Sequence, residues 1–132
     1  MQADAVKRKE KIESYKKIVL ENRRNDNDRV LEYCHKIIEL ADETSDEDAL
    51  GFAYFYIGEV EYLTNSIDEM FDSMSNALRY LGNSGQWYLA ARVYNVMGIT
   101  SVSRGNTVAA MEYYMSGLYI CEEYDVKSVQ SS

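Results

Sequence analysis

Cys34 and His35 stand side by side and are the residues of this chain best suited to form a nucleophile and its base. His35 is the sole histidine. Neighbouring residues of a helix point about 100° apart, and nucleophilic catalysis also needs a third group that orients the base. We therefore interpret the pair as a packed cysteine beside a surface histidine.

Two further patterns suggest ligand chemistry, a glycine-containing segment and two acidic clusters. The segment Gly82–Gly85 lacks the Lys and the following Ser or Thr of a phosphate-binding loop. The clusters Asn25–Asp28 and Asp42–Asp48 lack the turn glycine and the trailing glutamate of a calcium loop. Acidic residues also cap helix starts, which is our interpretation here. We expect no catalytic set, metal site or cofactor, and thus no enzyme.

Composition limits the class of protein and of partner. The 132 residues include 14 Lys and Arg and 22 Asp and Glu, so the net charge is −8, and 46% are hydrophobic. These values are typical of one soluble globular domain. The acidic balance argues against nucleic acid and against anionic membrane surfaces as partners, because both attract basic proteins. Acidic residues accompany the basic residues of Lys7–Lys17 at helical spacing, so this stretch is interpreted as a solvated face.

The chain carries no recognisable targeting or anchoring pattern. Cys34 and Cys121 show no metal spacing and no disulfide framework. No apolar run follows the basic N-terminal stretch, and none approaches the length of a membrane span. We therefore expect a cytoplasmic protein without a membrane association.

Helical spacing of apolar residues dominates the chain. Apolar side chains recur at intervals of three and four over six segments: 4–23, 28–43, 46–64, 67–81, 86–104 and 107–124. The absence of proline and the presence of only seven glycines also favour helices. We predict an all-α fold of six helices of about 16–20 residues, paired as three antiparallel hairpins.

Residues between the segments are typical of helix ends. Ser66 and Glu69 have the spacing of a capping box, in which each side chain satisfies a free backbone N–H group. Asn106 suits the N-cap of the last helix. Gly82 and Gly105 suit the left-handed residue that ends a helix. We expect short turns at these places.

The chain repeats itself with a period of 40 residues. A shift by 40 places Tyr54 on Tyr94, Gly58 on Gly98 and Ala77 on Gly117. Small residues at these places allow paired helices to approach closely, and the tyrosine fills the space between them. The first 44 residues follow the pattern less closely. We predict one domain over 1–125, with repeats over about 4–44, 45–84 and 85–125, and a polar tail over 126–132.

These residue types and spacings resemble the tetratricopeptide repeat, most closely at Tyr94, Met97, Gly98, Gly105, Asn106, Ala110, Tyr114, Gly117 and Leu118. The middle unit departs at Asn65 and Met70, and the period exceeds the usual value of about 34. Leu50–Glu59 and Gly85–Ile99 are also similar to the amino-terminal repeat region of bacterial GGDEF-domain (diguanylate cyclase) signalling proteins. The resemblance implies an α-α superhelix that binds a protein or peptide. It would be the sensory or regulatory input region of a signalling protein whose GGDEF domain is missing from this chain.

The first helix of each hairpin is expected to line the concave side of such an array. Its outward-turned residues form our predicted ligand groove: Phe52, Phe55, Glu59, Tyr62, Arg92, Asn95, Ile99 and Val102. An aromatic surface with a few hydrogen-bonding groups is typical of peptide grooves. The alternative, in which Phe52 and Phe55 pack on the first hairpin and the groove is only structural, stays open.

The last predicted helix, 107–124, keeps apolar residues on a face that no later helix would cover: Val108, Met111, Met115, Leu118 and Tyr119. Terminal helices of repeat arrays normally have a polar outer face. We expect either that the natural chain continues with a further helix or that this helix pairs with a second copy in a homodimer. Self-association without a separate ligand is therefore the alternative function.

Overall fold

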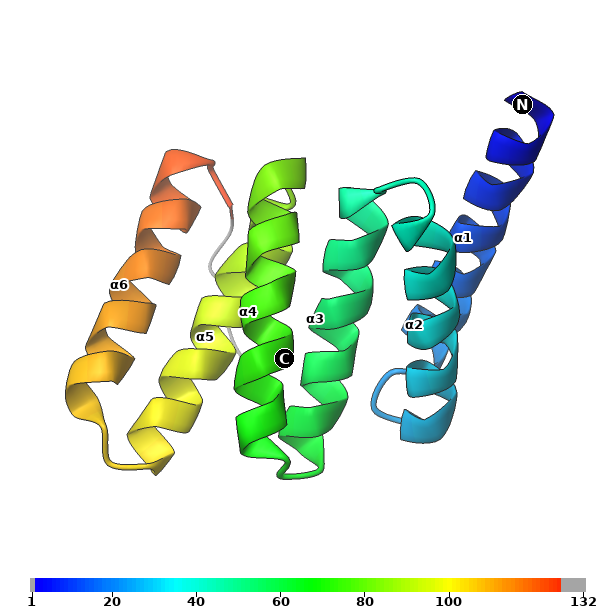
Figure 1. Ribbon diagram of the computed structural model, residues 1–132. Helices are drawn as coiled ribbons and strands as arrows, with labels where there is room; N and C mark the ends of the chain where they lie inside the picture. The colour runs from blue at the N-terminus through cyan, green and yellow to red at the C-terminus, as the bar shows by residue number, and fades with distance from the viewer. Residues whose placement is uncertain (1, 127–132) are drawn as a thin grey trace.

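The computed structural model describes residues 2–126, which form six α-helices and, within that range, no strand. The helices are α1 (Gln2–Asn22), α2 (Asn27–Asp42), α3 (Glu47–Leu63), α4 (Ile67–Ser84), α5 (Trp87–Ser103) and α6 (Thr107–Glu123). They cross the molecule in chain order, with α1 at one end and α6 at the other (Figure 1). The predicted all-α fold is confirmed, and the predicted tail beyond residue 126 lies outside the described residues.

Consecutive helices pack as three hairpins, α1 with α2, α3 with α4, and α5 with α6. Each new hairpin stacks on the previous one through its first helix, since α3 packs against α2 and α5 against α4. The first helices also contact each other, α1 with α3 and α3 with α5, and so line one side of the array. Central α3 is buried on nearly all sides, in agreement with its apolar sequence.

The turns that follow α2, α3, α4 and α5 are built alike. Left-handed residues stand at positions 45, 65, 85 and 105, each one position before the next N-cap. At each turn the N-cap N–H donates to the carbonyl oxygen five residues earlier, over 2.8 to 3.0 Å. This is the hydrogen bond of a Schellman motif. The 40-residue period in the sequence therefore consists of two helix–turn units of 20 residues each.

The predicted helix ends are confirmed only in part. Asn106 caps α6 by accepting from the Ala109 N–H group at 3.1 Å, and Gly105 is left-handed with φ of 77°. Gly82 lies inside α4 instead, because the helix continues to Ser84 and the left-handed residue is Gly85. Ser66 stands at the N-cap of α4, but its side chain makes no cap hydrogen bond, so the predicted capping box is wrong.

The two acidic clusters supply helix caps. Asp26 accepts from the Arg29 N–H group and Asp46 from that of Ala49, both at 3.1 Å. Among residues 2–126, no group of three His, Cys, Asp or Glu side chains is placed to hold a metal ion. In the same range no helix has both the length and the apolar character needed to cross a membrane.

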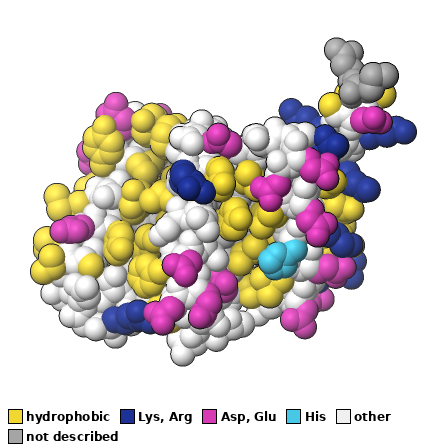
Figure 2. All heavy atoms as spheres, viewed as in Figure 1, with side chains coloured by type: hydrophobic (Ala, Val, Ile, Leu, Met, Phe, Trp, Pro, Cys, Tyr) yellow, Lys and Arg dark blue, Asp and Glu magenta, His cyan; other side chains and the backbone are white. Residues whose placement is uncertain are grey.

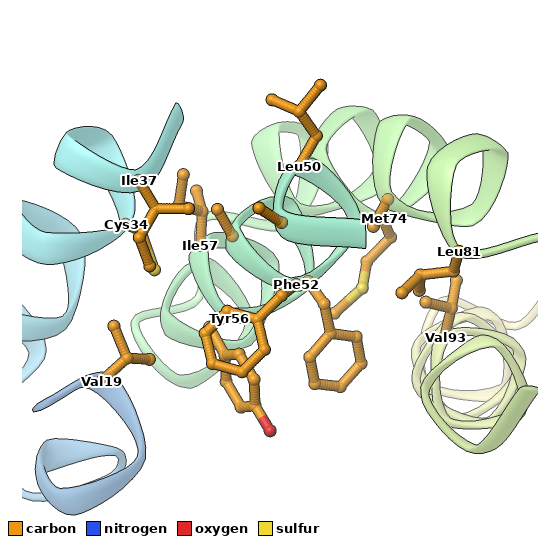
Figure 3. Packing of buried hydrophobic residues seen from close by; sticks show 14 of the residues in the cluster. Val19, Cys34, Ile37, Leu50, Phe52, Tyr56, Ile57, Met74, Leu81 and Val93 are labelled. Carbon is orange, nitrogen blue, oxygen red and sulfur yellow. The ribbon is translucent and has the colours of Figure 1, made fainter. Parts of the chain in front are cut away.

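Small residues bring paired helices together, as their spacing predicts. A Cβ atom at Gly58 would lie 2.9 Å from Cε of Met74, and one at Gly98 would lie 2.6 Å from the ring of Tyr114. The core continues through the stack on both sides of α3 (Figure 3). Cys34 of α2 is fully buried in it, whereas the neighbouring His35 is exposed. This confirms the interpretation of that pair as a packed thiol beside a surface imidazole.

Candidate functional site

The eight residues predicted to line a concave groove differ widely in exposure. The buried ones are Phe52, Phe55, Glu59 and Arg92, the half-buried ones Tyr62, Asn95 and Ile99, and the exposed one Val102. Phe52 and Phe55 do not turn outward as expected. Their ring centroids lie 4.7 and 4.9 Å from that of Tyr56 inside the core. Figure 3 shows Phe52 and Tyr56 among the buried residues. The reason is that α1 and α5 flank α3 and cover the face that would otherwise be concave.

Glu59 is the centre of an ion cluster that joins the first and third hairpins to the second. Its carboxylate accepts from Nε of Arg23 at 3.1 Å and from Nη2 of Arg23 at 2.6 Å. It also accepts from Nη2 of Arg92 at 2.9 Å, and Nη2 of Arg24 lies 3.8 Å away. The Glu59 side chain is only 7% exposed and that of Arg92 only 11%. A carboxylate so far removed from water requires charged, hydrogen-bonding partners.

Aromatic rings surround the guanidinium groups of this cluster. Cζ of Arg92 lies 4.9 Å from the ring centroid of Phe55, and Cζ of Arg23 lies 5.6 Å from that of Tyr56. The hydrogen bond with Glu59 raises the pKa of Arg23, against the opposing effect of burial. Burial raises the pKa of Tyr56, and the nearby positive charges of Arg23 and Arg92 oppose that shift. Glu59 and Arg92, predicted as ligand-binding residues, are thus partners of each other.

Exposed apolar side chains gather on α6, the last helix of the array (Figure 2). The exposed fractions are 71% for Val108, 65% for Met111, 64% for Met115, 58% for Leu118 and 62% for Tyr119. Their spacing places them on one face of the helix. The prediction that this face is uncovered is confirmed for the described residues.

Two hollows lie beside this face. One, of about 300 Å³, lies between α5 and α6, and its lining includes Asn95, Tyr114 and Leu118. The other, of about 330 Å³, is lined by Val102, Met111, Tyr114 and Leu118 among others. Because Tyr114 and Leu118 line both, the hollows form one surface, which we call the α5–α6 surface. Asn95 and Val102 of the predicted groove therefore contribute to this surface.

The equivalent surfaces of the first two hairpins are occupied by helices of this chain. With α3 packed on α2 and α5 packed on α4, Cys34 of α2 and Met74 of α4 are both 0% exposed. The equivalent residue of α6 in the 40-residue register is Tyr114, which is 40% exposed. Among residues 2–126, α5 is the only helix that packs against α6. The α5–α6 surface is thus shaped like a helix-docking surface and is uncovered in the described part of the chain.

Sequence reasoning missed Arg23 and Arg24 in the ion cluster. Both belong to the turn after α1, and Arg23 meets Glu59 across 36 positions of sequence. No local pattern around either arginine indicates that contact. Comparison with known proteins adds no relative, because no family model, curated protein or solved structure matches the chain.

Proposed function

We propose that this chain is a non-catalytic protein-binding module that receives an apolar helix of its partner on the α5–α6 surface. The proposal rests on a comparison of the three hairpins. Helix α3 packs on the first hairpin and α5 on the second, whereas no later helix of residues 2–126 packs on the third. Apolar hollows beside an exposed helix face are typical of surfaces that bind an amphipathic helix. The concave side is a weaker candidate, because four of its eight predicted residues are buried.

The chemistry of the partner helix follows from the helices that occupy the equivalent places. The buried residues of α5 include Ala90 and Val93, so small apolar side chains allow a helix to approach a hairpin closely. Asn95 and Glu122 supply polar groups at the edge of the α5–α6 surface. A bound helix would therefore have one apolar face with small residues and a polar margin.

The likeness to tetratricopeptide repeats supports the same class of function, since such arrays bind proteins and peptides. Within this proposal the module is the sensory or regulatory input region of a bacterial signalling protein. Its GGDEF-type output domain would belong to a longer chain, and its location would be cytoplasmic. The similarity of Leu50–Glu59 and Gly85–Ile99 to such proteins is the support for that part of the proposal.

A peptide with the sequence of α5, Trp87–Ser103, is a suitable probe, because α5 itself packs on the second hairpin. We expect its titration into isotope-labelled chain at low protein concentration to shift the amide NMR signals of Ala91, Tyr114 and Leu118. Signals from α1 and α2 are expected to stay in place. A scrambled peptide of the same composition is the control. Absence of binding at millimolar peptide, or binding away from the α5–α6 surface, would contradict the proposal.

A further inference from the structure

We infer that the helix that covers α6 is α6 of a second copy of this chain, packed antiparallel about a two-fold axis that crosses the exposed face of α6 at the level of residue 113. The inference rests on the proposed function, because it names the partner of the same surface. Three observations carry it: the residue types on the exposed face, the symmetry of their spacing, and the charges along the helix.

At Met115 and Tyr119 the exposed face of α6 is apolar where the inner helices of the array are polar. In the 40-residue register Met115 takes the place of His35 and Ser75, and Tyr119 takes the place of Glu39 and Arg79. Those four polar side chains stay exposed even though another hairpin is stacked beside them. A further hairpin stacked on α6 would accordingly leave Met115 and Tyr119 in water. Their apolar character requires a cover that reaches further around the helix than array stacking does.

The apolar stripe on α6 is symmetric about its midpoint. Val108, Met111, Met115 and Leu118 are separated by three, four and three positions. In an antiparallel pair with its axis at the level of residue 113, Val108 faces Leu118 of the second copy, and Met111 faces Met115. Spacing of three and four is also the pattern with which two helices interlock side chains at a small crossing angle. The stripe therefore complements itself, which a surface for an unrelated partner does not need to do.

The charges on α6 favour the antiparallel arrangement over a parallel one. The helix carries Glu112, Glu122 and Glu123 and no Lys or Arg. In a parallel pair each glutamate would approach the same glutamate of the other copy. In the antiparallel pair, Glu122 and Glu123 lie near the N-terminus of the other α6, where the free N–H groups and the nearby Arg104 attract negative charge.

The exposed patch supplies the apolar centre of a dimer interface. The five side chains of the α6 face, together with Val102 at 53% and Tyr114 at 40% exposure, form one patch. Such a patch measures on the order of several hundred Å², and each partner of a typical stable interface buries roughly 800 Å². Residues around the patch, such as Thr107 and Glu122, would add the remaining polar rim.

Sedimentation velocity of the full chain from micromolar to millimolar concentration tests the dimer. We expect a reversible monomer–dimer equilibrium, and Met115→Glu is expected to raise its dissociation constant by about 100-fold. Leu20→Glu is the matched control, because it adds the same charge at a residue of α1 that is 47% exposed. That variant is expected to dimerise almost like the parent. Circular dichroism verifies that both variants keep their helices.

A mixing experiment tests the antiparallel register. Met111→Lys and Met115→Glu are each expected to be monomeric alone. In a one-to-one mixture they are expected to form a heterodimer, because the new lysine faces the new glutamate while the two remaining methionines face each other. In a parallel pair neither new charge would meet the other. A mixture that stays monomeric while the parent dimerises would overturn the register.

Failure of this inference is distinguishable from failure of the proposed function. A parent chain that stays monomeric at millimolar concentration overturns the dimer. If the α5 peptide still binds that monomer at the α5–α6 surface, the proposed function stands, with the helix of another protein or of a longer chain as the occupant. A dimer that Met115→Glu leaves unchanged would overturn the choice of α6 as the interface. Where the parent dimerises through α6, the peptide is expected to compete and lower the dimer fraction.

Discussion

At the scale of single residues, the carboxylate of Glu59 is buried and accepts from Arg23 and Arg92. Its neutralisation would leave the guanidinium of Arg92 buried without a counter-charge. We predict that Glu59→Gln lowers the free energy of unfolding by about 3 kcal/mol, as measured by urea denaturation at neutral pH. The control is Asp68→Asn, which breaks an exposed ion pair with Arg104 and is expected to cost at most about 1 kcal/mol. Equal losses for the two variants would contradict this account of the cluster.

The thiol of Cys34 makes the fold sensitive to alkaline pH. Burial raises its pKa from 9.0 to about 12. Between these values the folded chain keeps a proton that the unfolded chain releases, so this contribution to stability is complete below about pH 9 and falls as the pH rises toward about 12. We predict a shallower alkaline loss of stability in Cys34→Ala, measured as unfolding free energy against pH. Parallel curves for parent and variant would show that the thiol is not responsible.

Sequence patterns predicted some residue roles and missed others for a physical reason. Periodicity gives the direction of a side chain on its own helix, and it correctly placed Cys34 in the core. It does not say which other helices lie in that direction. Phe55 and Glu59 therefore appeared outward-turned, although α1 and α5 cover them. The contact of Arg23 with Glu59 depends on tertiary packing alone, so no pattern within the turn could reveal it.

At the scale of helices, two glycines that both lie inside helices have opposite expected effects. A Cβ atom at Gly58 would lie 2.9 Å from Cε and 3.1 Å from Cγ of Met74, which is fully buried. A Cβ atom at Gly82, inside α4, would meet nothing within 4 Å. We predict that Gly58→Ala lowers the free energy of unfolding by about 1–3 kcal/mol through overpacking.

Gly82→Ala is the matched variant at this scale. It is expected to raise the free energy of unfolding by about 0.5–1 kcal/mol, because alanine loses less backbone entropy in a helix. Thermal unfolding of both variants beside the parent gives the comparison. Shifts of the same sign would mean that the approach of α3 to α4 at Gly58 is not tight.

Helix bounds were predictable to within a few residues, and the error at Gly82 has a clear origin. Glycine favours the left-handed position but does not require it. The left-handed position recurs here every 20 residues, and Gly85 rather than Gly82 occupies it. Ser45 and Asn65 occupy the same left-handed position without being glycine, so residue type alone identifies only some of the turns.

At the scale of the whole molecule, the array has an enclosed centre and two ends. Helix α3 has neighbours on both sides, whereas α6 packs against α5 and presents its apolar face to solvent. We predict the slowest amide hydrogen exchange in α3. Raising the protein concentration is expected to slow exchange in α6 and to leave α1 unchanged, as measured by mass spectrometry of peptides from each helix. Exchange in α6 that does not depend on concentration would argue against its pairing.

The ion cluster has a consequence for communication along the chain. In a simple stack each hairpin senses only its neighbours, so the two ends are energetically independent. Glu59 belongs to the second hairpin, yet Arg23 belongs to the first and Arg92 to the third. A partner that displaced Arg92 would change the charge available to Arg23, and by thermodynamic reciprocity a change at Arg23 would alter the partner's affinity by the same factor. Because both arginines bind one carboxylate, we expect the first and third hairpins to be energetically coupled.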